Sequence, residues 1–138
     1  MFERILIAYD GSEPAGKAFE RALDLAARYG ARLDVLAVAR PPEFAEDVET
    51  EALLDSAREH FEARFAALRQ RAAQAGVQAG FEIRVGHPAE QVVQFAEQRA
   101  VDLIVTGHRG KGLFERWLLG SVSRLVIAYA RCTVMVVR

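Results

Sequence analysis

The chain contains a single cysteine, Cys132, and a net charge of only −1, and it lacks any long hydrophobic run. One cysteine excludes a disulfide within the chain, which fits a reducing compartment. The longest apolar stretches are far shorter than a membrane span. The near-zero net charge creates no overall field that would draw the chain to nucleic acid or to an anionic membrane. We therefore expect neither a nucleic-acid nor a membrane partner.

Targeting, repeat and metal-binding patterns are also missing from the sequence. Residues 1–4 lead directly into a strand-like run, so we expect no signal peptide and a cytoplasmic protein. His60, His87 and His108 have no metal-ligand spacing with one another or with Cys132, which argues against a structural metal. We expect Cys132 to be partly buried and unreactive, and His108 to be exposed.

What the chain does have is the size and composition of one soluble domain. It has 138 residues, of which 51% are hydrophobic and 27% charged. This length supports a real core but is too short for two typical domains. We therefore treat residues 1–138 as a single domain.

Strand-like and helix-like segments alternate along this domain. Short apolar runs indicate strands, and apolar positions that recur every three or four residues indicate helices. The expected strands cover residues 4–9, 33–39, 78–85, 101–105 and 133–137. The expected helices cover about 13–29 and 51–75, begin again at Pro88, and cover about 120–129, with an acidic, irregular loop over 43–50. This alternation predicts an α/β fold with an open, doubly wound, five-stranded parallel sheet and helices on both faces.

A glycine-rich stretch, residues 104–122, follows the fourth expected strand. In doubly wound sheets, ligands bind beyond the carboxyl ends of the strands, where the strand order reverses. Glycines let the backbone approach a ligand closely, and a helix that starts near Ser121 would offer free N–H groups to a phosphate. Asp10 follows the first expected strand and Val38 lies at the end of the second, so both would meet this stretch at the same edge of the sheet. The sequence therefore predicts a phosphate-binding site there.

The stretch matches neither of the two most familiar phosphate motifs. A Walker A loop needs Lys and Ser/Thr where Leu113 and Phe114 stand. The dinucleotide fingerprint belongs after the first strand, where residues 10–14 (Asp-Gly-Ser-Glu-Pro) lack it.

The spacing Gly107-x2-Gly110-x9-Gly120-Ser121 instead resembles the nucleotide-binding motif of the universal stress protein family, Gly-x2-Gly-x9-Gly-Ser/Thr. Residues 8–12 (Ala-Tyr-Asp-Gly-Ser) resemble the opening motif of that family. Residues 36–38, 102–107 and 132–137 resemble further family segments in the same order, so the resemblance covers essentially the whole chain.

This resemblance implies an adenine-nucleotide α/β domain with strand order 3-2-1-4-5 that binds ATP. It implies that Asp10 lies near the ribose and the metal-phosphate end, with Mg²⁺ as the metal, and that the backbone of Val38 meets the adenine edge. Arg109 and Lys111 are candidates for contact with the γ-phosphate. The expected nucleotide-binding residues are Ala8, Asp10, Val38, Gly107, Arg109, Gly110, Gly120, Ser121 and Val122.

Simpler interpretations of these residues stay open. The glycines could only shape a surface loop, Asp10 could only form a turn or cap a helix, and Ser121 could only be an N-cap. Trp117 is better explained as a packing anchor for the loop than as a platform for a base. The loop cations, including Arg109, could simply be solvated.

Three functions are compatible with this sequence. The first is an ATP-binding stress-response regulator, with little or no hydrolysis, in which ATP occupancy changes conformation or the binding of an unidentified regulatory partner. The second is a slow Mg²⁺-dependent ATPase or phosphotransferase; the loop has no evident catalytic carboxylate beyond Asp10, which favours the first. The third is a structural dimer module with an empty pocket. The resemblance also implies a homodimer through the last strand, whose apolar run from Val134 to Val137 would present an open edge.

Overall fold

The computed structural model of the chain describes residues 1–43, 47–108 and 119–138. Strands and helices alternate through these residues as the sequence predicts, and each expected strand lies within two residues of an observed one. The elements in chain order are β1 (Arg4–Ala8), α1 (Glu13–Tyr29), β2 (Arg32–Ala39), α2 (Asp47–Gln74), β3 (Ala79–Val85), α3 (Pro88–Gln98), β4 (Leu103–Gly107), α4 (Ser121–Tyr129) and β5 (Thr133–Val137).

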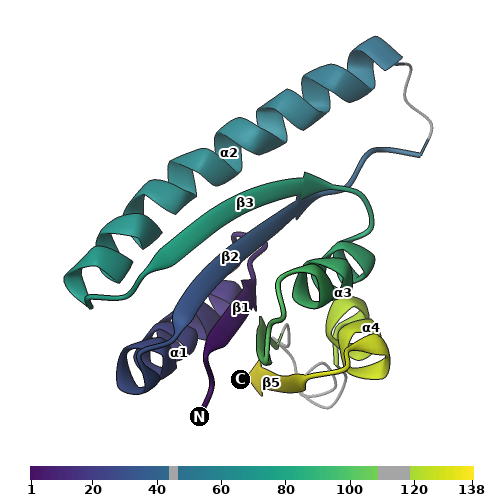
Figure 1. Cartoon of the computed structure of the whole chain (residues 1–138). Helices are drawn as coiled ribbons and strands as arrows, with labels where there is room; N and C mark the ends of the chain where they lie inside the picture. Colours follow the sequence, from purple (N-terminus) through teal and green to yellow (C-terminus); the bar gives the residue numbers. More distant parts are fainter. Residues whose placement is uncertain (44–46, 109–118) are drawn as a thin grey trace.

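The strands form one parallel sheet in the order β3-β2-β1-β4-β5 (Figure 1). The chain first builds outward from β1 through β2 to β3 and then returns to the other side of β1 for β4 and β5. The strand order therefore reverses between β1 and β4. Both the doubly wound fold and the strand order implied by the resemblance are confirmed.

Two hydrophobic cores cover the two faces of the sheet. Alternate residues of a strand face opposite sides, so Ile5 and Ile7 pack under α1 and α2, while Leu6 packs under α3 and α4. All three of these side chains are fully buried, as expected for a central parallel strand. No helix in the described residues is both long and apolar enough to cross a membrane.

Helix α2 is longer than the sequence suggested. It begins at Asp47, so the loop expected over residues 43–50 is wrong for residues 47–50. The acidic side chains that suggested a loop, among them Asp47 and Glu49, lie in the first turn of the helix, where they oppose the positive end of the helix dipole. The helix runs alongside β3 (Figure 1) and is anchored by Phe65, whose ring centroid lies 5.2 Å from that of Phe81.

The apolar residues after Pro88 predict that Ala89, Val92, Val93 and Ala96 form the inward face of α3. Ala89, Val92 and Ala96 are buried, but Val93 is only half-buried, and Phe95 occupies the core instead. Phe95 follows Val92 by three residues and so belongs to the same helical stripe.

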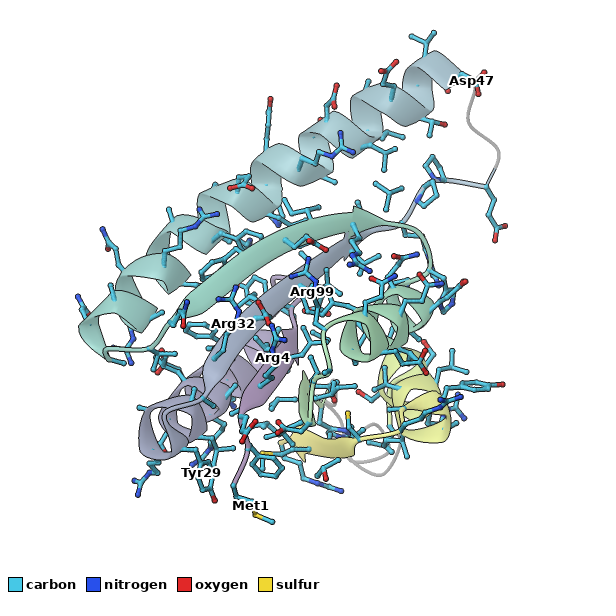
Figure 2. The ribbon with its side chains drawn as sticks, viewed as in Figure 1. Met1, Arg4, Tyr29, Arg32, Asp47 and Arg99 are labelled. Carbon is cyan, nitrogen blue, oxygen red and sulfur yellow. The ribbon has the colours of Figure 1, made fainter. Side chains whose placement is uncertain are left out.

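Charged side chains occupy the amino-terminal ends of β1 and β2. Arg32 pairs with Asp34 through an Nε–Oδ1 distance of 3.3 Å, and Asp34 is only 3% exposed. Arg4 lies beside Arg32 in the register of β1 and β2, and Figure 2 shows both near Arg99. Gly80 lies beneath this group, where a Cβ would stand 2.6 Å from an Nη atom of Arg32. Ion pairs therefore line this part of the sheet.

Candidate functional site

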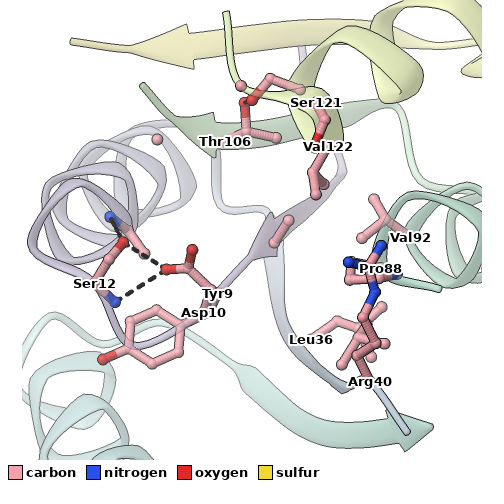
Figure 3. A pocket seen from close by; sticks show the side chains of 16 residues that line it. Tyr9, Asp10, Ser12, Leu36, Arg40, Pro88, Val92, Thr106, Ser121 and Val122 are labelled. Atoms are coloured by element: carbon pink, nitrogen blue, oxygen red, sulfur yellow. Dashed lines mark hydrogen bonds between the residues drawn. The ribbon is translucent and has the colours of Figure 1, made fainter. Parts of the chain in front are cut away.

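A cavity of about 350 Å³ opens at the carboxyl ends of β1, β2 and β4, at the reversal of strand order. This is where doubly wound sheets bind ligands. The cavity is lined by Ala8, Tyr9, Asp10, Ser12, Ala15, Leu36, Val38, Arg40, Pro88, Val92, Thr106, Gly107, Gly120, Ser121, Val122 and Ser123 (Figure 3). All seven expected site residues that the structure describes are among them. The other two, Arg109 and Gly110, lie outside the described residues, as do Lys111 and Trp117.

Asp10 forms the tight turn between β1 and α1. Its Oδ1 accepts hydrogen bonds from the Ser12 backbone N–H at 3.0 Å and from the Ser12 hydroxyl. The Ser12 Oγ in turn accepts a bond from the Ala15 N–H at 3.3 Å and so caps α1, as expected for a serine directly before a helix. The turn-forming interpretation of Asp10 is therefore correct, and it is compatible with a ligand role because the carboxylate also lines the cavity and is exposed.

The end of β2 presents an unpaired strand edge to the cavity. The Tyr9 N–H donates to the Leu36 carbonyl at 2.9 Å, which is the last bond between β1 and β2, because β1 ends at Ala8. The backbone groups of Val38 point to the same side as those of Leu36, since neighbouring residues of a strand alternate. No residue of β1 stands opposite Val38, so its N–H and C=O face the cavity and can pair with a polar ligand edge.

The start of α4 lies across the cavity from this strand edge. Gly120 is the N-cap and Ser121 is the first helical residue, so the N-cap interpretation of Ser121 is wrong by one position. A glycine cap has no side chain that could accept a hydrogen bond from the first N–H groups of the helix. These groups have no intrahelical acceptors and carry the positive end of the dipole, so the arrangement suits an anion.

The two described glycines of the motif are required for different reasons. A Cβ on Gly107 would lie 2.5 Å from the backbone carbon and oxygen of Pro14, so this glycine lets β4 pack against the start of α1. Around Gly120, no atom of the described residues lies within 4 Å of an added Cβ, and its φ of −60° suits any residue. Of these two glycines, only Gly120 is free of close contacts with the described residues.

Several cavity residues were not predicted from the sequence. Thr106 and Ser123 are buried, and their hydroxyls lie 3.1 Å apart, joining the end of β4 to the first turn of α4. Arg40 and Pro88 line the end of the cavity near Val38. Arg40 could have been found from the alternation of β2, because it follows Val38 by two residues and so shares its side of the strand.

His108 is buried, at 7% exposure, so the expectation that it is exposed is wrong. Its backbone N–H donates to the Val137 carbonyl at 2.7 Å, which extends the pairing of β4 with β5 and holds the residue inside the fold. It does not line the cavity. Within the described ranges, no three His, Cys, Asp or Glu side chains form a group that could hold a metal ion.

Comparison with known proteins gives one consistent family. The model of the universal stress protein family matches residues 1–138. A universal stress protein of Thermus aquaticus is 38% identical over 140 residues, and the match covers 100% of this chain and 100% of that protein. The universal stress protein UspA of Lactobacillus plantarum superimposes with a TM-score of 0.84 at 29% identity, over 99% of this chain and 98% of its own.

Two further solved structures share the fold at lower identity and are described as nucleotide complexes. One is a universal stress protein in complex with cAMP, at 23% identity and a TM-score of 0.76, with 99% of this chain and 97% of that one covered. The other is the universal stress protein of Archaeoglobus fulgidus in complex with dAMP, at 18% identity and a TM-score of 0.68, with 100% and 98% covered.

Proposed function

The chain belongs to the universal stress protein family, and from this premise we propose that it binds ATP in the cavity between β1 and β4 and acts as a nucleotide-dependent regulator in a stress response. The observation that carries the proposal is the pairing of a free strand edge at Val38 with an open helix start at Gly120 across one cavity. The strand edge can form hydrogen bonds with a base, and the helix start can bind phosphates. The solved relatives described as complexes with cAMP and dAMP support a nucleotide as the ligand.

Each part of the cavity has a role in this proposal. The N–H and C=O of Val38 pair with the adenine edge, and the apolar side chains of Leu36 and Val92 flank the base. The backbone N–H groups of Ser121 and Val122 bind phosphate oxygens, and the Ser121 hydroxyl adds a further donor. The carboxylate of Asp10 binds the ribose hydroxyls or holds Mg²⁺, which would neutralise phosphate charge.

We propose binding with little or no hydrolysis. Phosphoryl transfer needs charge clamps and a group that orients the nucleophile. Asp10 is the sole carboxylate among the described residues that line the cavity, and it is already engaged by Ser12. A change of conformation or of partner binding on ATP occupancy is then the output of the site.

The test is ATP affinity, measured by calorimetry in wild-type protein and in Gly120→Val. We expect wild-type protein to bind ATP and to release adenine nucleotide when a fresh preparation is denatured. Gly120→Val should bind at least tenfold more weakly, because its side chain fills the space beside the helix start. Gly16→Val is the matched control, since Gly16 also has no neighbour within 4 Å and lies outside this cavity. Equal ATP affinity in all three proteins would refute the site.

The proposed role of Asp10 has its own test, the variant Asp10→Asn. Asparagine keeps an Oδ1 acceptor for the Ser12 turn but removes the charge that would hold a metal. We expect Mg²⁺ to strengthen ATP binding in wild-type protein and to have no effect in the variant. An unchanged Mg²⁺ effect in Asp10→Asn would exclude Asp10 as the metal ligand. ATP turnover above background in wild-type protein, abolished in the variant, would favour the slow ATPase instead.

A further inference from the structure

Arg40 has no counter-ion among the described residues and lies at the end of the cavity where we propose that the base binds. It follows the last residue of β2, is exposed, and lines the cavity together with Leu36, Val38 and Pro88. In the part of the chain that the structure describes, Arg40 makes no ion pair or side-chain hydrogen bond. Figure 3 shows the Arg40 side chain directed toward Pro88, another residue that lines the cavity. An arginine that served only to keep the surface hydrated would not need this orientation.

The start of α3 lines the same cavity as Arg40. Pro88 is the first residue of α3, and the N-cap His87 makes no side-chain hydrogen bond to the helix start. The first N–H groups of α3 therefore lack a capping acceptor, and the positive end of the helix dipole faces the same region as the guanidinium. Two positive, donor-only features side by side favour a ligand that brings an electron-rich acceptor between them.

The cavity walls beside Arg40 restrict the kind of ligand that can carry this acceptor. Leu36, Val38 and Val92 line the cavity with apolar side chains, and apolar walls suit an aromatic ring. The backbone of Val38 can form hydrogen bonds with one polar edge of such a ring. Arg40 follows Val38 by two residues and lines the same cavity, so its side chain can contact a neighbouring edge of the ring. In a purine, the edge next to the pairing edge carries N7, an acceptor in both adenine and guanine, and guanine adds O6 beside it. Pyrimidines have no atom equivalent to N7.

We infer that the Arg40 guanidinium donates a hydrogen bond to N7 of the bound base and makes this site selective for purine nucleotides. This inference rests on the proposed nucleotide site and adds the residue that chooses the base. Adenine accepts this bond at N7, which pyrimidine bases lack, so Arg40 favours ATP over CTP and UTP.

The test compares ATP with 7-deaza-ATP, which replaces N7 by a C–H group and keeps the phosphates. We expect wild-type protein to bind ATP about tenfold more tightly than 7-deaza-ATP, the effect of one hydrogen bond from a charged donor. In Arg40→Met the ratio should fall to about one, and the preference for ATP over CTP should fall with it. Arg131→Met is the matched control, because Arg131 is an exposed arginine outside the cavity.

The outcomes separate the inference from the proposed function. If Arg40 instead binds a phosphate, Arg40→Met will weaken ATP and 7-deaza-ATP equally and leave their ratio unchanged, which overturns the inference alone. Equal affinities for the two nucleotides in wild-type protein overturn it as well. Failure of wild-type protein to bind any of these nucleotides overturns the proposed function and the inference together.

Discussion

At the scale of single residues, Gly107 and Gly120 belong to one sequence motif but satisfy different physical demands. Gly107 is fixed by the backbone of Pro14, which would collide with any Cβ. Gly120 has free space around it in the described structure and an ordinary backbone conformation. The first glycine is a requirement of the fold, and the second is a requirement of the ligand that we propose.

Substituting the two glycines by alanine should separate these demands. We expect Gly107→Ala to lower the free energy of unfolding by about 1–3 kcal/mol, since the extra methyl overpacks a rigid contact. Gly120→Ala should stay within about 0.5 kcal/mol of wild type, as surface substitutions do. Urea denaturation followed by circular dichroism measures both. Equal stabilities for the two variants would contradict the packing role of Gly107.

Cys132 is half-buried before β5, and burial raises the pKa of its thiol above the ordinary value. The thiolate is the nucleophile, so a raised pKa leaves less of it at neutral pH. We expect iodoacetamide to alkylate folded protein more slowly at pH 7 than chain unfolded in urea. The rate should also reach half its maximum at a higher pH in folded protein. A shared pH midpoint would show that folding does not perturb this thiol.

At the scale of elements, the strand starts are held by contacts across the chain. Asp102, just before β4, accepts hydrogen bonds from the backbone N–H groups of Glu3 at 2.9 Å and Arg4 at 3.1 Å. One carboxylate thereby ties the beginning of β1 to the beginning of β4. The pairing of these two strands starts directly afterwards, at Ile5 and Leu103. This keeps the two strands in register, and their other ends form the cavity.

Asp102→Ala should lower the free energy of unfolding by more than the removal of an ordinary surface carboxylate does. We expect a loss of about 1–3 kcal/mol in the free energy of unfolding, because two backbone donors lose a charged acceptor. Faster hydrogen exchange at the start of β1 should accompany it. Asp24→Ala is the control, since Asp24 forms only an exposed ion pair with Arg28 and should change stability by less than about 1 kcal/mol. Equal losses in the two variants would contradict the tying role.

Much of the element structure could be predicted from residue patterns. The apolar run at β1 and the cap formed by Ser12 are local signals, and both appear where expected. The first turn of α2 was missed because acidic residues favour a helix start as much as an exposed loop. The burial of His108 was missed because it depends on pairing between β4 and β5, which no local pattern reports.

At the scale of the whole molecule, β5 leaves one edge of the sheet open. Within the described residues, β5 pairs only with β4. The Val137 carbonyl points toward β4, where it accepts the His108 N–H, so the backbone groups of Val136 point to the open edge. The unpaired N–H and C=O groups of an apolar edge strand can form hydrogen bonds with a strand of another chain. The proposed homodimer would pair this edge with its twofold mate.

Proline at position 136 tests the dimer directly. Val136→Pro removes an outward N–H without touching the bonds to β4, so we expect wild-type protein to be a dimer by light scattering and the variant to be a monomer. Val136→Thr keeps the N–H and should remain dimeric. Circular dichroism checks that both variants fold. A monomeric wild-type protein would refute the dimer, and a dimeric proline variant would place the interface elsewhere.

The sequence by itself determined the order of elements, the doubly wound class and the glycine spacing, because these are local patterns of burial, capping and turn formation. Only the tertiary structure decided which residues share the cavity. Asp10, Val38 and Gly120 are far apart in the chain and meet because parallel strands end at one edge of the sheet. The packing of Gly107 against Pro14 and the role that we propose for Arg40 likewise depend on contacts between distant segments, which sequence spacing alone does not encode.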